Sequence, residues 1–219
     1  MEKLSFSKVS KADLKRFVQL EEKGIAAYSW LDLDHIQLTK DEVQQLQYIQ
    51  SHLLNYSLHL MNEATIWARG IYPFLLLAEQ DQVQALAEVP LQAKYSLFEL
   101  EGIADGVLAK GIANSAEVPY LVVVEAKKGL DNQNPLYQLY GQLLAAGHLN
   151  WEENQKDPQE IYGCYTIADV WTFVRANIAN LKSEYPKITL EFSREYSSKN
   201  EGEIVLKMLK SIVNQHLKL

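Results

Sequence analysis

The sequence predicts an α/β protein with a mixed central sheet flanked by helices, because helical and strand-like patterns follow one another along its 219 residues. An amphipathic stretch from Thr39 is followed by several runs rich in Leu, Val and aromatic residues. A second helical stretch, more strand-like runs and a last amphipathic helix complete the order. We expect one domain, with residues 1–38 as an N-terminal helical extension, residues 39–168 as the core and residues 169–219 as C-terminal strands and a helix.

The helix signals begin with Ser10, a predicted N-cap for a short helix in the segment "SKADLKRFVQLEEKGIAAY". Thr39 and Glu42 have the capping-box spacing, in which each side chain bonds the backbone N–H of the other residue. The apolar stripe that follows repeats every ~3.6 residues. It predicts a helix that continues to about Arg69 and ends at Pro73.

Two further helices are expected in the second half of the chain. Pro135 stands at a first-turn position, where its missing N–H costs nothing, and Leu139 and Leu143 continue one apolar face. A last amphipathic helix is expected from about Glu201 to Leu217.

Strands are predicted on both sides of the helix at Pro135. Before it, "FLLLAE", "KYSLFELE", "IADGVLA" and "YLVVVEA" are rich in the residues that strands favour. After it, "IYGCYTIA", "VWTFVRANI" and "KITLEFSREY" have the same character, and the first two suit a hairpin around Asp169.

The composition is that of an ordinary globular protein, with 47% hydrophobic and 22% charged residues. No apolar run approaches the ~20 residues that span a bilayer, and the N-terminus has no apolar signal core. A single cysteine, Cys164, rules out an internal disulfide and is typical of a reducing compartment. We therefore expect a cytoplasmic protein without a membrane partner.

The net charge of −7 opposes non-specific binding to nucleic acid. It does not exclude a local basic groove, because four lysines lie in the central region: Lys94, Lys110, Lys127 and Lys128.

The stretch "GIADGVLAKGIANSAEVPYLVVVEAKKG", residues 102–129, carries the chemistry. "YLVVVEAK" is apolar on both faces for five residues, as in a central strand that is covered on both sides. Alternate residues of a strand share a face, so Glu125 and Lys127 project to the same side, about 7 Å apart along the strand, while Ala126 points away. The alternative is an ordinary strand-end Glu–Lys pair in solvent.

Asp105 lies between Gly102 and Gly106, which permit a bend and the close approach of backbone or ligand. If its strand neighbours that of Glu125, two carboxylates and the Lys127 ammonium converge. Two carboxylates with water ligands suit Mg²⁺ or Mn²⁺, since these hard cations prefer oxygen.

The pattern "GIAD" followed by "VVVEAK", in which Glu125 comes twenty positions after Asp105, resembles the PD-(D/E)XK superfamily of restriction-endonuclease-like nucleases. The resemblance implies a core of helix, three strands, helix and strand over about residues 39–168. It implies that Asp105 and Glu125 are metal ligands, with the Ala126 carbonyl as a further ligand, and that Lys127 is the catalytic lysine. Ala104 replaces the proline that usually precedes the aspartate.

The resemblance also points to residues on two helices. Many members use a carboxylate from the first core helix, and Glu63 is the candidate for a metal ligand; a solvated Glu near a helix end is an equal alternative. "NPLYQLYGQLLAAGHL" resembles the Gln/Tyr-bearing helix of RecB-like members, although Leu136 stands where their Gln would precede Tyr140. Gln138 is the candidate catalytic residue and Gln142 a second choice; a polar surface face would also explain both.

Other sites are not supported by the sequence. The five histidines form no metal-ligand spacing, and there is no Walker loop, dinucleotide fingerprint, HExxH or GxSxG motif. Several aromatic residues could stack bases, although core packing explains them as readily. They are Trp151, Tyr162, Tyr165, Trp171 and Phe173.

The expected function is Mg²⁺- or Mn²⁺-dependent hydrolysis of phosphodiester bonds, with DNA as the expected substrate, by a chain that could act as a homodimer. The alternative is a catalytically inactive protein of the same fold that serves as an interaction or assembly module. The acidic pI of about 5.3 favours the alternative, and the presence of all three motif residues opposes it. The form of the substrate stays open.

Overall fold

Eight strands form one mixed sheet in the computed structural model, which describes residues 1–113, 115–127 and 134–217. The strands are β1 (Glu2–Ser5), β2 (Gln19–Ile25), β3 (Val83–Lys94), β4 (Phe98–Ile112), β5 (Ser115–Lys127), β6 (Gln159–Ile167), β7 (Val170–Ala179) and β8 (Lys187–Ser197). Their order is β1-β4-β5-β6-β7-β8-β2, and β3 pairs with β4. The predicted α/β class with a mixed sheet is confirmed.

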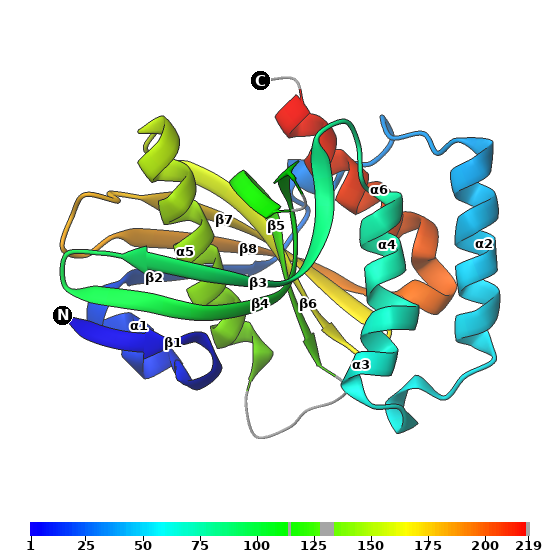
Figure 1. Ribbon diagram of the computed structural model, residues 1–219, viewed down its shortest axis with the longest axis horizontal. Helices are drawn as coiled ribbons and strands as arrows, with labels where there is room; N and C mark the ends of the chain where they lie inside the picture. Colours follow the sequence, from blue (N-terminus) through cyan, green and yellow to red (C-terminus); the bar gives the residue numbers. More distant parts are fainter. Residues whose placement is uncertain (114, 128–133, 218–219) are drawn as a thin grey trace.

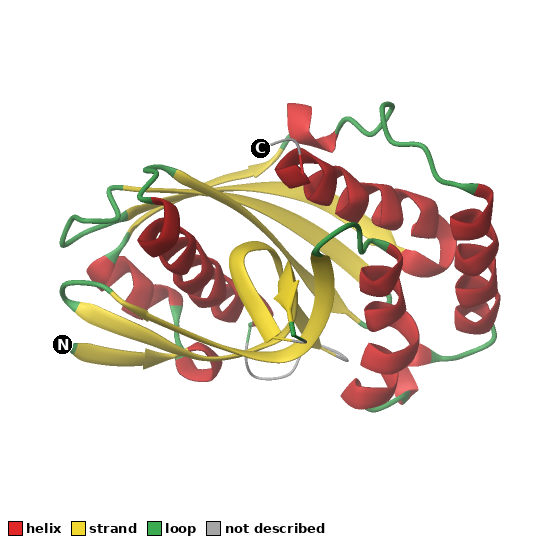
Figure 2. Cartoon of the chain, turned by 45° about the horizontal axis from the view of Figure 1, so that its top comes forward, coloured by secondary structure: helices red, strands yellow, loops and turns green. Residues whose placement is uncertain are grey.

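Helices cover both faces of the sheet (Figure 1). They are α1 (Lys11–Phe17), α2 (Lys40–Leu54), α3 (Glu63–Ile66), a π-helical turn (Trp67–Ile71), α4 (Tyr72–Leu77), α5 (Pro135–Asn154) and α6 (Ser198–Leu217), with 3₁₀ turns at Phe6–Lys8, Ser29–Leu31 and Leu58–Leu60. One buried core lies under α5, and a second lies under α2, α4 and α6. Figure 2 shows the strong twist of the sheet, with α5 inside its curve. Among the described helices, none has the length and apolar character needed to cross a bilayer.

The pairing of β4 determines where the candidate site lies. β3, β4 and β5 form an antiparallel meander, and α5 then crosses over to β6, which is parallel to β5. β3 accompanies β4 along its length, whereas β5 pairs with β4 from Gly106↔Val124 to Ile112↔Ser115. Nearer the start of β4, β1 takes the place beside it, from Glu2↔Phe98 to Ser5↔Glu101. β4 and β5 therefore diverge beyond Gly106 and Val124, and we call this point the fork.

The expected N-terminal helical extension is wrong in part. Ser10 caps α1 as predicted, but the helix ends at Phe17 and the chain continues as β2. β1 and β2 both join the main sheet, next to β4 and β8. Residues 19–25 contain several good helix formers, so their local preference is overridden by backbone pairing with β8.

The first core helix is also shorter than expected. The capping box at Thr39 is present, but α2 ends at Leu54. Pro73 does not end a helix; it lies in the first turn of α4, where a missing N–H is tolerated. "FLLLAE" belongs to α4 and the turn after it rather than to a strand, because a short apolar run does not distinguish a buried helix from a strand.

β3 was not predicted: its apolar residues alternate from Val83 to Ala93, but Pro90 opposes a strand because it has no N–H for pairing. A proline is tolerated in this strand because β3 has β4 as its partner on one side only. The remaining predictions for the second half are confirmed: Pro135 lies in the first turn of α5, β6 and β7 form a hairpin around Asp169, and α6 ends the described chain.

Phe6 tests whether the N-terminal segment is part of the core. Its ring is 1% exposed and lies directly on the backbone at Gly102 and Gly141. Phe6→Ala should lower the free energy of unfolding by about 3–5 kcal/mol, because it removes a buried aromatic ring and leaves a cavity. Chemical denaturation measures this loss. Ile25→Ala, at a side chain that is 68% exposed, is the control and should change stability by less than about 0.5 kcal/mol. A similar small effect at both positions would contradict an integral N-terminal segment.

Candidate active site

Asp105 lies at the fork and bridges the two diverging strands. Its Oδ2 accepts a hydrogen bond from the backbone N–H of Ala126 at 2.7 Å. A carboxylate of β4 thus satisfies an N–H of β5 just beyond the last paired residues, Gly106 and Val124. Asp105 therefore stabilises the separation of the strands as well as supplying a carboxylate to the site.

Glu125 and Lys127 lie on one face of β5, as the strand pattern predicts. The Lys127 Nζ is 2.9 Å from Glu125 Oε1. The other carboxylate oxygen, Oε2, accepts a hydrogen bond from Gln142 Nε2 at 2.7 Å. Glu125 and Gln142 are both 0% exposed. A buried carboxylate is costly without partners, and here one ammonium and one amide provide them.

Gln142 reaches the site from α5, whereas Gln138 makes no side-chain hydrogen bond within the described chain. The alternative of a polar surface face is wrong for Gln142, because α5 is buried from Leu139 to His148 between the sheet and the N-terminal segment. A sequence signal did exist. Gln142 is an amide in the middle of "LYGQLLAAGHL", and a polar residue inside such an apolar run needs a buried partner.

Glu63 is the first residue of α3 and lies on the other side of Lys127. Its Oε1 is 3.5 Å from Lys127 Nζ, and its side chain is 51% exposed. Glu63 therefore belongs to the site through its ion pair with Lys127. Glu63 is also a half-exposed glutamate at a helix end, so the alternative of a solvated side chain stays open.

Glu88 is an acidic residue near the site that the sequence reasoning missed. β3 pairs with β4 through Ala87↔Gly106 and Val89↔Ala104, which places Glu88 opposite Asp105. Its φ is +53°, a left-handed conformation that is uncommon for a residue with a side chain. No sequence signal points to it, because the alternation in β3 assigns Glu88 to an ordinary solvent-facing position.

A pocket of about 450 Å³ opens next to the fork. It is lined by Glu63, Ala64, Trp67, Ala87, Glu88, Asp105 and Ala126. The pocket lies between α3 and the strands β3, β4 and β5. Its walls are three carboxylates, one indole and three alanines, so charged and apolar groups line it together.

Burial and mutual repulsion raise the pKa values of both central carboxyls. Burial raises the pKa of Asp105, and the charges of Glu63 and Glu88 add to this against the opposing N–H of Ala126. Burial, followed by the charge of Asp105, raises the pKa of Glu125 to about 7, although Lys127 and Gln142 act in the opposite direction. The site has more negative charge than its lysine neutralises, and a cation would relieve this imbalance.

Lys127 stays protonated in this environment. Burial lowers its pKa, but the carboxylates of Glu125, Asp105 and Glu63 outweigh burial and raise the pKa above its ordinary value. The side chain is thus a fixed positive charge and a hydrogen-bond donor near neutral pH.

The donor atoms fit Mg²⁺ or Mn²⁺ in their chemistry. Asp105, Glu125 and the Ala126 carbonyl offer oxygen only, which hard cations prefer, and Mg²⁺ commonly keeps several waters. Within residues 1–113, 115–127 and 134–217, no three acidic, His or Cys side chains are grouped closely enough to ligate one ion together. Water and the backbone would therefore have to complete the coordination.

The other lysines of the central region do not join the site. Lys94 and Lys110 lie near opposite ends of the β3–β4 hairpin, in register with Glu99 and Val83. Lys128 lies outside the described residues. Lys94, Lys110 and Lys127 therefore do not form the local basic groove that the sequence allowed.

The aromatic residues considered for base stacking are mostly in the core. Tyr162, Trp171 and Phe173 are at most 1% exposed, so packing accounts for them. Cys164 is also buried, as expected.

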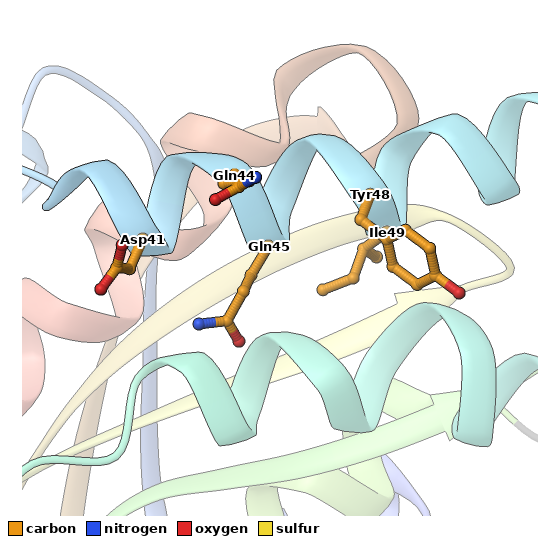
Figure 3. A pocket seen from close by; sticks show the side chains of 5 residues that line it. All are labelled: Asp41, Gln44, Gln45, Tyr48 and Ile49. Carbon is orange, nitrogen blue, oxygen red and sulfur yellow. The ribbon is translucent and has the colours of Figure 1, made fainter.

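A second hollow, of about 390 Å³, lies on the surface of α2. Figure 3 shows its lining residues, Asp41, Gln44, Gln45, Tyr48 and Ile49, which all come from that helix. It has one carboxylate and no second charged side chain in its lining, so it offers less chemistry than the fork.

No protein-family model matches the chain, and a search of curated proteins also found no match. Assignment to a family therefore depends on the motif and on the arrangement of the site.

Glu125→Gln tests whether the buried negative charge of Glu125 lowers the stability of the folded protein. The folded-state pKa of Glu125 is raised, so the folded protein binds more protons than the unfolded chain between the ordinary glutamate range and about pH 7. Its carboxyl therefore costs stability as the pH rises through that window. The substituted side chain would keep an oxygen acceptor for Gln142 without the charge.

In EDTA, the Tm of Glu125→Gln should exceed that of the wild type at pH 8, and this difference should be several degrees smaller at pH 5. In a domain of this size, about 1 kcal/mol of stability corresponds to roughly 2–4 °C in Tm. Differential scanning calorimetry at the two pH values measures this. Glu153→Gln, at an exposed position of α5, is the control and should show no pH-dependent difference. An equal change at pH 5 and pH 8 in Glu125→Gln would mean that Glu125 titrates in its usual range.

Proposed function

We propose that the protein is a metal-dependent nuclease of restriction-endonuclease-like fold that hydrolyses phosphodiester bonds in DNA. One observation carries the proposal: at the fork, the buried Glu125 is held between Lys127 and Gln142 beside Asp105. The order of elements from α2 to β6 supports it, since helical segments, three strands, a helix and a strand follow one another as the resemblance implies.

Each motif residue has a distinct role in this proposal. Asp105 and Glu125 would hold Mg²⁺ or Mn²⁺ together with the Ala126 carbonyl, and the cation would lower the pKa of a bound water and stabilise charge on the phosphate. Lys127, which stays protonated, would orient the attacking water and offset negative charge on the phosphate oxygens. Gln142 positions Glu125, because it fixes the carboxylate oxygen that Lys127 does not contact.

The alternative is a catalytically inactive protein that uses the same fold as an interaction module. Two observations favour it. Lys127 is already paired with both Glu125 and Glu63, and the net charge of −7 opposes DNA binding away from the site. Against it stands the cost of two neighbouring buried carboxylates, which an interaction module has no reason to retain.

A cleavage assay on circular, linear and single-stranded DNA in Mg²⁺ or Mn²⁺ separates the two functions. Lys127→Ala should reduce the cleavage rate by about 10²–10³-fold, because it removes the positive charge that faces the phosphate. Lys94→Ala, at an exposed lysine near the end of β3, should cut at the wild-type rate. Equal cutting by the wild type and Lys127→Ala would place the activity elsewhere, and no cutting by the wild type on any form would favour the interaction module.

Metal binding is tested separately with two substitutions of Asp105. Asp105→Asn keeps an oxygen that can accept the Ala126 N–H but removes the charge, whereas Asp105→Ala removes both. Mg²⁺ or Mn²⁺ at about 100 times its Kd should stabilise the wild type by ~2.7 kcal/mol, measured as a rise in Tm.

The rise in Tm caused by the metal should be lost in both Asp105 variants. Only Asp105→Ala should also lower the Tm without metal, because it leaves the Ala126 N–H without its acceptor. Glu184→Gln, an exposed carboxylate, should keep the full rise. A full rise in Asp105→Asn would exclude Asp105 as a ligand.

A further inference from the structure

We propose that the pocket beside the fork holds one unpaired nucleotide, with its base stacked against Trp67, so that the substrate is single-stranded or locally unpaired DNA at the cut. This inference rests on the proposed nuclease function and names its substrate class. The pocket is the one lined by Glu63, Ala64, Trp67, Ala87, Glu88, Asp105 and Ala126.

Trp67 is fixed next to the proposed metal ligands. A Cβ placed on Gly106 would lie 2.4 Å from the Trp67 Cη2, so the indole rests directly on the backbone of β4, one residue from Asp105. The neighbouring ring of Tyr72 is tilted by 36° to the indole, with the ring centroids 5.8 Å apart. Trp67 is only half-buried, and part of it lines the pocket. The indole is therefore an immobilised flat surface beside the reaction site.

The backbone at Trp67 is unusual as well. The π-helical turn Trp67–Ile71 begins at this residue, between α3 and α4. π-Helical turns are rare and are often found at functional sites, where they change the direction in which a side chain points.

The volume of the pocket is sufficient for a single base. Its volume of about 450 Å³ is within the range of small-ligand sites. The small side chains of Ala64, Ala87 and Ala126 leave free space beside the indole. A base that leaves the stack to lie on the indole cannot keep its partner in a duplex, so the nucleotide must be unpaired. Enzymes that act on bases in pockets likewise require single strands or extrude the nucleotide from the duplex.

The charges of the pocket decide which part of a nucleotide enters it. Glu63 and Glu88 line the pocket and repel phosphate, and Glu88 stands opposite Asp105. The backbone phosphate is therefore directed to the cation-binding carboxylates and Lys127, while the uncharged base enters toward the indole. Stacking on an aromatic ring accepts any base, so this contact would provide affinity without sequence preference.

The test measures binding and cleavage separately. Binding is followed by anisotropy of a fluorescein-labelled single-stranded 20-mer and of the same sequence as a blunt duplex, in Ca²⁺. Trp67→Ala should weaken single-strand binding by roughly 5- to 100-fold, the range that loss of one stacked base produces. Trp67→Phe should stay within a few-fold of the wild type, because it keeps an aromatic face. Trp151→Phe, at a half-exposed tryptophan of α5, is the control.

A second measurement uses the wild-type protein, so it does not depend on a variant that folds. Single strands with one abasic position, moved stepwise along the oligonucleotide, should show a loss of affinity at the position next to the scissile phosphate. A uniform response along the strand would overturn the inference. So would single-strand binding by Trp67→Ala at wild-type strength with an unchanged Tm.

Failure of the inference and failure of the proposed function give different results. Cleavage of blunt duplex as fast as of single strands, unaffected by Trp67→Ala but lost in Lys127→Ala, would keep the nuclease and exclude the pocket. Single-strand binding that depends on Trp67, without cleavage by the wild type in Mg²⁺ or Mn²⁺, would keep the pocket and exclude the nuclease.

Discussion

The separation of β4 from β5 is the constraint on which the site depends. Two long antiparallel strands would normally continue to pair, which would leave no opening between them. Here the Asp105 carboxylate accepts the N–H of Ala126 at the fork, so the strands diverge without a lost hydrogen bond. β1 occupies the place beside β4 that β5 leaves, which keeps the first residues of β4 paired on both sides. The N-terminal segment thereby helps to keep the fork open.

The same arrangement concentrates charge where the sheet would otherwise be apolar. Glu125 follows a run of buried apolar residues and is itself fully buried, so its carboxylate depends on Lys127 and Gln142. These partners come from β5 and from α5, the helix that crosses over the sheet. The resulting pKa of about 7 reports that the partners do not fully compensate burial and the neighbouring Asp105. A structure that served only stability would not keep this cost, which is the physical basis for a catalytic interpretation.

Around this charged centre the two faces of the fork differ. The α5 side supplies an amide within a closely packed core. The α3 side supplies a pocket lined by an indole, three alanines and three carboxylates. The first side can position a reacting group and the second can admit a ligand. Both depend on small residues of β4: Gly106 makes room for Trp67, and Gly102 makes room for Phe6 of the N-terminal segment.

The sequence by itself determined the local features: the caps at Ser10 and Thr39, the helix at Pro135, and the shared face of Glu125 and Lys127. These depend on residues close in the chain, whose geometry follows from backbone periodicity. Only the tertiary structure decided that residues 19–25 pair with β8, that Gln142 rather than Gln138 meets Glu125, and that Glu88 stands opposite Asp105. Each of these depends on partners distant in the sequence, and pairing and burial between such partners outweigh local preference.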